Sequence, residues 1–489
     1  MLSARRDLWV SMGSLMLTMF LAALDQTVVA TALPTIAGEL HGVDSLSWLI
    51  TAFALTSGIS TPLYGKLSDM YGRRRLYLSA IVLFLAGSAL CGIATSMVQL
   101  IAFRAFQGIG AGGLMVLTMT IMADIATPAQ RARFQGLFGG VMGVASISGP
   151  LVGGLLTEHI SWRWIFYINL PLGVVALAVA FAVLKLPRRT SPHRIDWLGF
   201  ALISGVLTCL TLLAAWGGVT YAWSSPVTIG LGLGAAVLLG LFVLVERSVA
   251  EPIVPLRLFA DRTLSLGAAA IVLLATGMLG AATFLATFLQ LVVGVSVSNS
   301  GLLTIPMMAG MVLTSMISGQ FVAKAGRYKW FVVAGVLLTA LSAFLFTTMS
   351  ATTGAFTCGV YMLIFGAGLG MVMQNLLLGV QSTAPPRDRG TATSAITFAR
   401  GIGGAVGVSI LGAVFSSRLG NVGSITPAAL GHLSQAARHG LQLAFADAVT
   451  GVFTVLTPLL VLGAVLLAFL PDVRLGAAEP APQEVGASV

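Results

Sequence analysis

Two oppositely charged residues lie inside stretches that are otherwise strongly apolar. Asp25 follows an uncharged run that begins near Leu8, and Arg104 lies a few residues into the run 98–123. A charged side chain in a hydrocarbon interior costs at least ~2.5 kcal/mol on insertion scales. Counted from opposite ends of their runs, the two residues fall at comparable depth. We therefore expect Asp25 to take up and release a proton, and Arg104 to tune its proton affinity.

The plainer interpretation of this pair is a permanent ion pair that holds two helices together. We favour proton exchange, because ionisable residues inside membrane spans mark ion and proton pathways. Other polar residues inside apolar runs leave two interpretations open: lining of a central cavity, or helix-to-helix hydrogen bonds and, for the arginine, extension to the membrane surface. These candidate cavity residues are Gln26, Gln107, Gln374, Asn375 and Arg400.

A dense cluster of charge lies in 65–75, which holds Lys66, Asp69 and three consecutive arginines, Arg73 to Arg75. The runs on either side, 46–64 and 76–94, contain no charged residue. Each is about the length that a helix needs to cross a bilayer core. The cluster therefore predicts a tight cytoplasmic turn between two membrane helices.

Composition indicates a polytopic membrane protein. The chain has 489 residues, of which 57% are hydrophobic and only 9% are charged, whereas soluble proteins carry about 25% charged residues. The net charge of +10 is spread over short loops and not gathered on a soluble domain, so we expect no nucleic-acid partner. The three cysteines fall inside apolar runs, where they are expected to be buried packing residues.

Fourteen apolar runs predict fourteen membrane helices, so the fold class is an all-α membrane protein. With a cytoplasmic N-terminus, 21 of the 26 cations fall on the inside, which supports the even count and two inside termini. A signal peptide is the weaker interpretation of the first run, which is too long for one. The approximate runs are 9–33, 46–64, 76–95, 98–123, 134–157, 164–186, 197–217, 226–246, 264–291, 299–323, 331–350, 354–380, 391–416 and 446–470.

An internal repeat divides the chain into two halves. The stretch 319–329 aligns with 65–75, so that Gly319 matches Gly65, while Ala323 replaces Asp69. Both copies fall on the same side, which indicates two parallel six-span halves with a central site between them. The predicted units are an N-terminal bundle (1–186), a linker with two extra helices (187–263), a C-terminal bundle (264–474) and a disordered tail (475–489).

The sequence shows no residue pattern typical of an enzyme active site. The five histidines all fall in loops, without metal-ligand spacing, and no phosphate-binding loop is present. We expect no metal and no cofactor. The run 134–157 is instead rich in small residues, which let helices approach closely, and a proline that kinks the helix. The residues of this motif are Gly143, Gly149, Pro150, Gly153 and Gly154.

Together these segments resemble the major facilitator superfamily and, within it, the fourteen-span drug:proton antiporters. The stretch 65–75, with Gly65 and Gly72, is similar to that superfamily's loop motif between spans 2 and 3, and 103–110 to its span-4 motif. Further similarities lie in 24–34 (multidrug exporters), 149–154 (antiporters) and 162–173 (the fourteen-span group).

The resemblance implies roles that the residues alone do not give. Asp69 would cap a helix start near 390–392, and Arg73 would meet Asp124 at the inner end of span 4. Together they would latch an outward-open state. The resemblance also links the Asp25–Arg104 pair to protonation.

The expected function is proton-driven export of amphipathic, cationic or neutral drugs across the cytoplasmic membrane of a bacterium. The protein would act as a monomer among membrane lipids. Because Asp25 is the single acid placed deep in a span, dicationic cargo should be handled poorly. Two alternatives stay open: an exporter of a lipid, siderophore or amino-acid derivative, and a membrane sensor or scaffold without transport.

Overall fold

The computed structural model describes residues 2–473 except 42–44, 185–195, 219, 250–251, 295–302, 386–387 and 420–434. The predicted tail, 475–489, and most of the basic linker that follows Pro187 lie outside the described residues, as does the middle of the loop 417–445.

The described residues form an all-helical fold without a β-sheet, which confirms the all-helical part of the predicted fold class. The helices are α1 (Leu2–Leu40), α2 (Leu46–Tyr71), α3 (Arg73–Ile93), α4 (Met97–Ile125), α5 (Pro128–His159), α6 (Trp164–Tyr167), α7 (Asn169–Val183), α8 (Trp197–Trp216), α9 (Pro226–Ser248), the 3₁₀-helix η2 (Leu256–Ala260), α10 (Arg262–Leu291), α12 (Ile305–Ala325), α13 (Lys329–Thr347), α14 (Ala355–Thr383), α15 (Arg389–Leu419) and α16 (Gln435–Ala468).

Thirteen of the described helical segments are long and apolar enough to cross a membrane. α2 is not among these thirteen, although its 26 residues exceed the length of a span. Its central part is interrupted by Thr, Ser and Gly residues, and its last two turns carry Lys66 and Asp69.

The predicted run 164–186 is broken into two helices, α6 and α7, which meet at Ile168. Pro171 explains the break, because it has no N–H to donate to the carbonyl of Tyr167 one turn earlier. The break places Asn169 at the start of α7, where it is fully buried.

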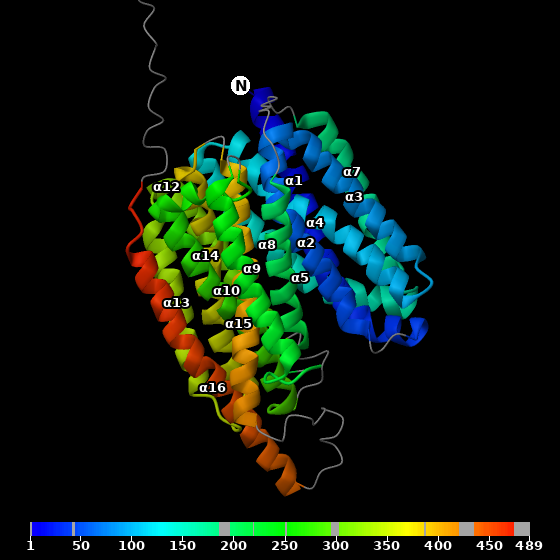
Figure 1. Ribbon diagram of the computed structural model, residues 1–489, viewed down its shortest axis with the longest axis vertical. Helices are drawn as coiled ribbons and strands as arrows, with labels where there is room; N and C mark the ends of the chain where they lie inside the picture. Colours follow the sequence, from blue (N-terminus) through cyan, green and yellow to red (C-terminus); the bar gives the residue numbers. More distant parts are fainter. Residues whose placement is uncertain are drawn as a thin grey trace, which may run out of the picture.

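Figure 1 shows α12 to α16 gathered on one side of the molecule and α1 to α4 with α7 on the other, with α8 and α9 between them in this view. Each side has its own apolar core, one built around Phe288, Phe346 and Phe453 and the other around Phe84, Phe134 and Phe138. α8 contacts both α2, which belongs to one side of the molecule, and α15, which belongs to the other.

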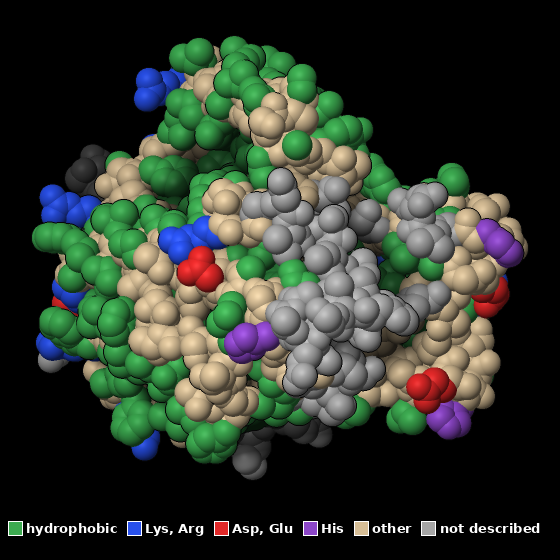
Figure 2. Space-filling model, turned by 90° about the horizontal axis from the view of Figure 1, so that it is seen from below, with side chains coloured by type: hydrophobic (Ala, Val, Ile, Leu, Met, Phe, Trp, Pro, Cys, Tyr) green, Lys and Arg blue, Asp and Glu red, His purple; other side chains and the backbone are tan. Residues whose placement is uncertain are grey.

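The outer surface is apolar, as lipid solvation requires. On α9, for example, the exposed side chains include Ile229, Leu233, Val237, Leu241 and Leu244, spaced about one helical turn apart. Figure 2 shows the end of the molecule opposite the N-terminus, where charged side chains are few among apolar ones.

Candidate functional site

Asp25 lies at the centre of a closed polar site. Its Oδ2 accepts a hydrogen bond from Arg104 Nη1 at 2.6 Å. Its Oδ1 accepts from Gln107 Nε2 and from Asn169 Nδ2, both at 2.9 Å. Asn169 Nδ2 also contacts Ser88 Oγ at 3.0 Å. These five residues, Asp25, Ser88, Arg104, Gln107 and Asn169, form what we call the Asp25 site.

Close helix packing brings the five residues together from four helices. Gly108 on α4 faces the backbone of Phe53 on α2, and Gly110 faces Phe84 on α3, so a side chain at either glycine would collide with a neighbouring helix. Gly87 on α3 leaves room for the backbone of Gln107 in the same way. α4 is thereby held between α2 and α3, and Arg104 is directed toward α1.

The site is sealed from solvent. Asp25 is 1% exposed and Arg104 2%, and the other three residues are fully buried. The Arg104 guanidinium lies over the Phe53 ring, 4.1 Å from its centroid, with Phe166 at 5.8 Å. Arg104 Nη1 also donates to Gln107 Oε1 at 2.8 Å, which fixes the amide so that its NH₂ points at Asp25. The Asp25 carboxyl group therefore receives three hydrogen bonds, one of them from a cationic donor.

Sequence analysis missed Asn169 and Ser88 as members of this site. Both are neutral and small, so neither interrupts the apolar pattern of its run as a charge does. The usable signal was the position of Asn169 two residues before Pro171, because a proline there breaks the helix and leaves a buried polar residue at the break.

A second cluster joins the two sides of the molecule. Asp69 Oδ2 accepts from the N–H of Thr391 at 3.3 Å and from its hydroxyl at 3.2 Å. Asp69 Oδ1 pairs with Arg73 Nη2 at 3.0 Å, and Arg73 Nη1 pairs with Asp124. Asp69 thus caps the first turn of α15, within the segment 390–392. We call Asp69, Arg73, Asp124 and Thr391 the Asp69 cluster.

Burial raises the pKa of Asp69, while the neighbouring Arg73 and the two bonds from Thr391 act in the opposite direction. Asp69 lies beyond the apolar part of α2. Two glycines shape its surroundings. A side chain at Gly65 would collide with Ser394, and Gly72 joins α2 to α3 with a φ of 89°, a conformation that favours glycine.

The small residues of α5 face two different helices. Gly143 packs against Val312 of α12, whereas Gly149 and Gly153 pack against Thr27 and Thr31 of α1. Gly154 faces open space, with no atom within 4 Å of the position that a β-carbon would occupy. Pro150 lies inside α5.

The candidate cavity residues are scattered. Gln107 belongs to the Asp25 site, and Gln26 is exposed on α1. Asn375 is buried and donates to Ser318 on α12 at 3.0 Å, a helix-to-helix bond. Gln374 is half-buried beside Gly139 of α5. Arg400 is half-buried on α15 and forms no ion pair with any described residue.

A hydrogen-bonded glutamine pair that the sequence did not indicate joins α5 to α14. Gln135 Nε2 donates to Gln381 Oε1 at 3.1 Å, and Gln381 Nε2 donates to Thr393 Oγ1 at 3.1 Å. Both glutamines are fully buried. This pair and the Asp69 cluster bind the same first turns of α15, so the two sides of the molecule are fastened together at this end.

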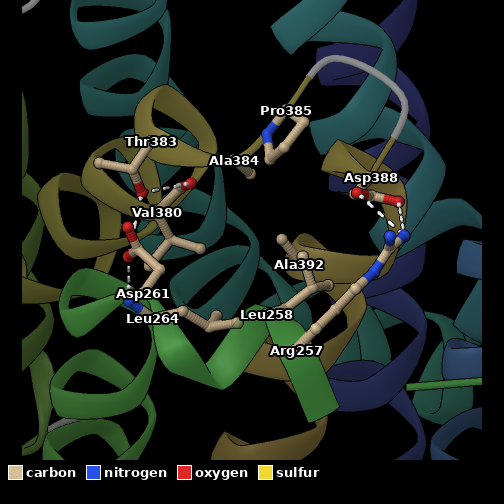
Figure 3. A pocket seen from close by; sticks show the side chains of 10 residues that line it. All are labelled: Arg257, Leu258, Asp261, Leu264, Val380, Thr383, Ala384, Pro385, Asp388 and Ala392. Carbon is tan, nitrogen blue, oxygen red and sulfur yellow. Dashed lines mark hydrogen bonds and ion pairs between the residues drawn. The ribbon is translucent and has the colours of Figure 1, made fainter. Parts of the chain in front are cut away.

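A pocket of about 320 Å³ lies next to this fastening, between η2, the end of α14 and the start of α15. Figure 3 shows Arg257 reaching across its mouth to Asp388, at 3.4 Å. The pocket contains none of the predicted site residues. Its lining residues are Arg257, Leu258, Asp261, Leu264, Val380, Thr383, Ala384, Pro385, Asp388 and Ala392.

The helices are long and apolar enough to cross a membrane, and they enclose a sealed charged site. The family model described as Major Facilitator Superfamily matches residues 15–408. The chain belongs to the major facilitator superfamily. This confirms the superfamily resemblance, while the fourteen-span antiporter subgroup stays a prediction.

Several relatives are named as drug transporters or efflux pumps. The chain is 42% identical over 411 residues to the multidrug transporter protein MdtP of Bacillus subtilis, covering 83% of this chain and 75% of the relative. It is 35% identical over 487 residues to multidrug resistance protein 3 of the same organism, covering 94% of each. The human organic anion transporter MFSD10 has the same fold, with a TM-score of 0.66 at 18% identity over 94% of this chain and 99% of that one.

Proposed function

We propose that this protein is a proton-coupled antiporter that exports amphipathic, cationic or neutral drugs or related lipophilic compounds across the cytoplasmic membrane of a bacterium. The observation that carries the proposal is the Asp25 site, a carboxylate sealed in an apolar bundle with three donors and one guanidinium. The names of the relatives support drug efflux as the direction and the cargo class.

The coupling step is proton binding at Asp25 Oδ2. A proton there replaces the Arg104 bond, because a neutral carboxylic acid gains far less from a guanidinium than a carboxylate does. Arg104 then keeps its bond to Gln107 Oε1 and its contact with the Phe53 ring. The loss of the ion pair frees α1 to move relative to α4. Cationic cargo competes with the proton, because both need the negative charge of Asp25.

Alternating access follows from the Asp69 cluster. It is closed in this structure, as is the Gln135–Gln381 pair, so this end of the molecule is shut. We assign this end to the cytoplasm and the conformation to the outward-facing state, since positively charged loops favour the cytoplasmic side. Opening requires Asp69 to leave Thr391.

The topology that we propose has fourteen spans, which are the thirteen apolar segments and α2. Both termini lie in the cytoplasm. α2 packs along α4, one of the thirteen apolar spans, and carries Asp69 at its end. A monomer contains the complete Asp25 site and the complete Asp69 cluster.

The test uses purified protein in liposomes with an imposed pH gradient and a lipophilic monocationic dye inside. Wild-type protein should expel the dye only when the gradient is present, and Asp25→Asn should not. Asp447→Asn, which changes an exposed acid in the first half of α16, is the matched control and should keep the activity. Gradient-dependent efflux by Asp25→Asn at the wild-type rate would overturn the proposal.

A further inference from the structure

A second pair of buried carboxyl groups lies at one end of the α8–α9 hairpin, away from the Asp25 site. Asp196 is the N-cap of α8 and is 8% exposed, and Glu246 lies in the last turn of α9 and is 3% exposed. Their atoms Asp196 Oδ2 and Glu246 Oε1 stand 2.3 Å and 3.1 Å from the point that a β-carbon on Gly199 would occupy. The two acids therefore flank the same glycine.

Each of the two carboxyl groups is only half satisfied. Asp196 Oδ1 accepts the N–H of Gly199 at 2.8 Å, and Glu246 Oε1 accepts the N–H groups of Ile253 and Val254 at 3.2 Å and 3.4 Å. The second oxygens, Asp196 Oδ2 and Glu246 Oε2, are buried without a hydrogen-bond partner among the described residues. A buried carboxylate oxygen without a donor is costly, and a proton on one of the two acids would supply a donor.

Among the described residues, few charged groups lie near the two acids. Asp196 and Lys66 are the charged groups that act on Glu246. Other charged residues on the elements packed here are Asp69 on α2, Arg247 on α9, which is exposed, Arg257 on η2, and Arg389 and Arg400 on α15. α15 faces the hairpin with Ala395 and Phe398. With one proton on the pair, one negative charge remains near Lys66, which acts on Glu246.

We propose that Asp196 and Glu246 share one proton and form a second protonatable site, which controls how firmly the α8–α9 hairpin braces the Asp69 cluster. This role goes beyond the proposed transport function. Two contacts attach the end of the hairpin and η2 to the surroundings of the Asp69 cluster, and together we call them the brace. Lys66 Nζ, three residues before Asp69, donates to Pro252 O at 3.2 Å, and Arg257 pairs with Asp388 at the start of α15.

The control works through residues 252–254, which precede η2. Glu246 holds Ile253 and Val254, which directly follow the Pro252 carbonyl that Lys66 binds. When the shared proton leaves, the ionised Glu246 accepts the N–H groups of Ile253 and Val254 more strongly and attracts Lys66. Residues 252–254 are then fixed more firmly, and the brace on the Asp69 cluster tightens as the pH rises.

Infrared difference spectroscopy of purified protein in nanodiscs tests the shared proton. The measurement uses Asp25→Asn protein, so that a failure of the coupling proposal does not affect the result. Raising the pH should remove one protonated-carboxyl carbonyl band, and adding either Asp196→Asn or Glu246→Gln should abolish that loss. Asp261→Asn, an N-cap acid of α10 with the same geometry, should leave the band unchanged. If the pH-dependent loss of the band persists in both Asp196→Asn and Glu246→Gln, the proposal is overturned.

Amide hydrogen exchange tests the brace on the wild-type chain, so it does not depend on whether the variants fold. The reference is the amide of Leu264, which Asp261 caps. Relative to this reference, the amides of Ile253 and Val254 should exchange roughly 5-fold more slowly once the pair has lost its proton, the change expected when a neutral hydrogen bond becomes charge-assisted. A constant ratio across neutral pH would contradict the proposal.

Discussion

Asp25 and Asn169 are 144 positions apart in the chain and share a 2.9 Å hydrogen bond in a site closed to solvent. The bond exists because Pro171 breaks the helix and leaves Asn169 at the start of α7. Asn169 therefore belongs to the same site as Arg104 and gives Asp25 a hydrogen bond that a nonpolar residue at this position could not give.

Asn169→Leu should shift the pH dependence of transport. Asn169→Leu removes one of the three hydrogen bonds that Asp25 receives, so the pH profile of transport should change. The measurement is dye efflux from liposomes over a pH series. Ser88→Ala removes the neighbour of Asn169 but no donor to Asp25, and should shift the profile less. An unchanged profile in Asn169→Leu would exclude Asn169 from the proton site.

Asp69 should make the protein less stable as the pH rises. Because burial raises the pKa of Asp69, the folded chain binds this proton more tightly than the unfolded chain. The resulting stabilisation is complete below the ordinary carboxyl range and is lost as the pH rises through the raised pKa. Asp69→Asn should remove this slope from the melting temperature, measured by tryptophan fluorescence in detergent, and should also reduce transport. Asp261→Asn is the control, and a slope that survives in Asp69→Asn would refute the assignment.

Two glycines of the α5 motif should differ sharply in their tolerance of a methyl group. Gly143→Ala places a β-carbon against Val312 of α12, whereas the same change at Gly154 meets open space. Overpacking of this kind costs about 1–3 kcal/mol, so Gly143→Ala should lower both the melting temperature and transport, and Gly154→Ala should change neither. Equal effects of the two substitutions would mean that contact with α12 is not the role of Gly143.

Dicationic cargo should be exported poorly. The Asp25 site supplies a single carboxylate and already contains one guanidinium, so a second positive charge on the cargo would have no partner there. Matched monovalent and divalent dyes, compared at equal gradient in liposomes, measure this difference. Equal efflux of the two dyes would show that cargo charge is neutralised elsewhere.

The charged part of the Asp25 site was predictable from the sequence, and its neutral part was not. Asp25 and Arg104 interrupt apolar runs at a high energetic cost, so their positions alone mark them. Gln107 was predicted as a cavity residue and instead lies sealed beside Asp25. Small polar residues such as Ser88 are common in membrane helices for packing, so their presence does not distinguish a site.

The helical fold was predictable because hydrophobic runs of span length have few other solutions in a membrane. Contacts between distant helices were harder to foresee. Gln135 and Gln381 lie 246 positions apart, and the sequence around each glutamine does not indicate that the other is its hydrogen-bond partner. Asp196 and Glu246 fall at the ends of their runs, where acids are unremarkable until the fold places them beside the same glycine.

The most direct test of the central claim is proton release on cargo binding, measured with purified protein in weakly buffered detergent solution. If a cationic cargo and a proton compete for Asp25, adding the cargo at a pH where Asp25 is protonated must release protons from wild-type protein and none from Asp25→Asn. Cargo that binds the wild-type protein without releasing protons, or that releases equal amounts from Asp25→Asn, would contradict the account.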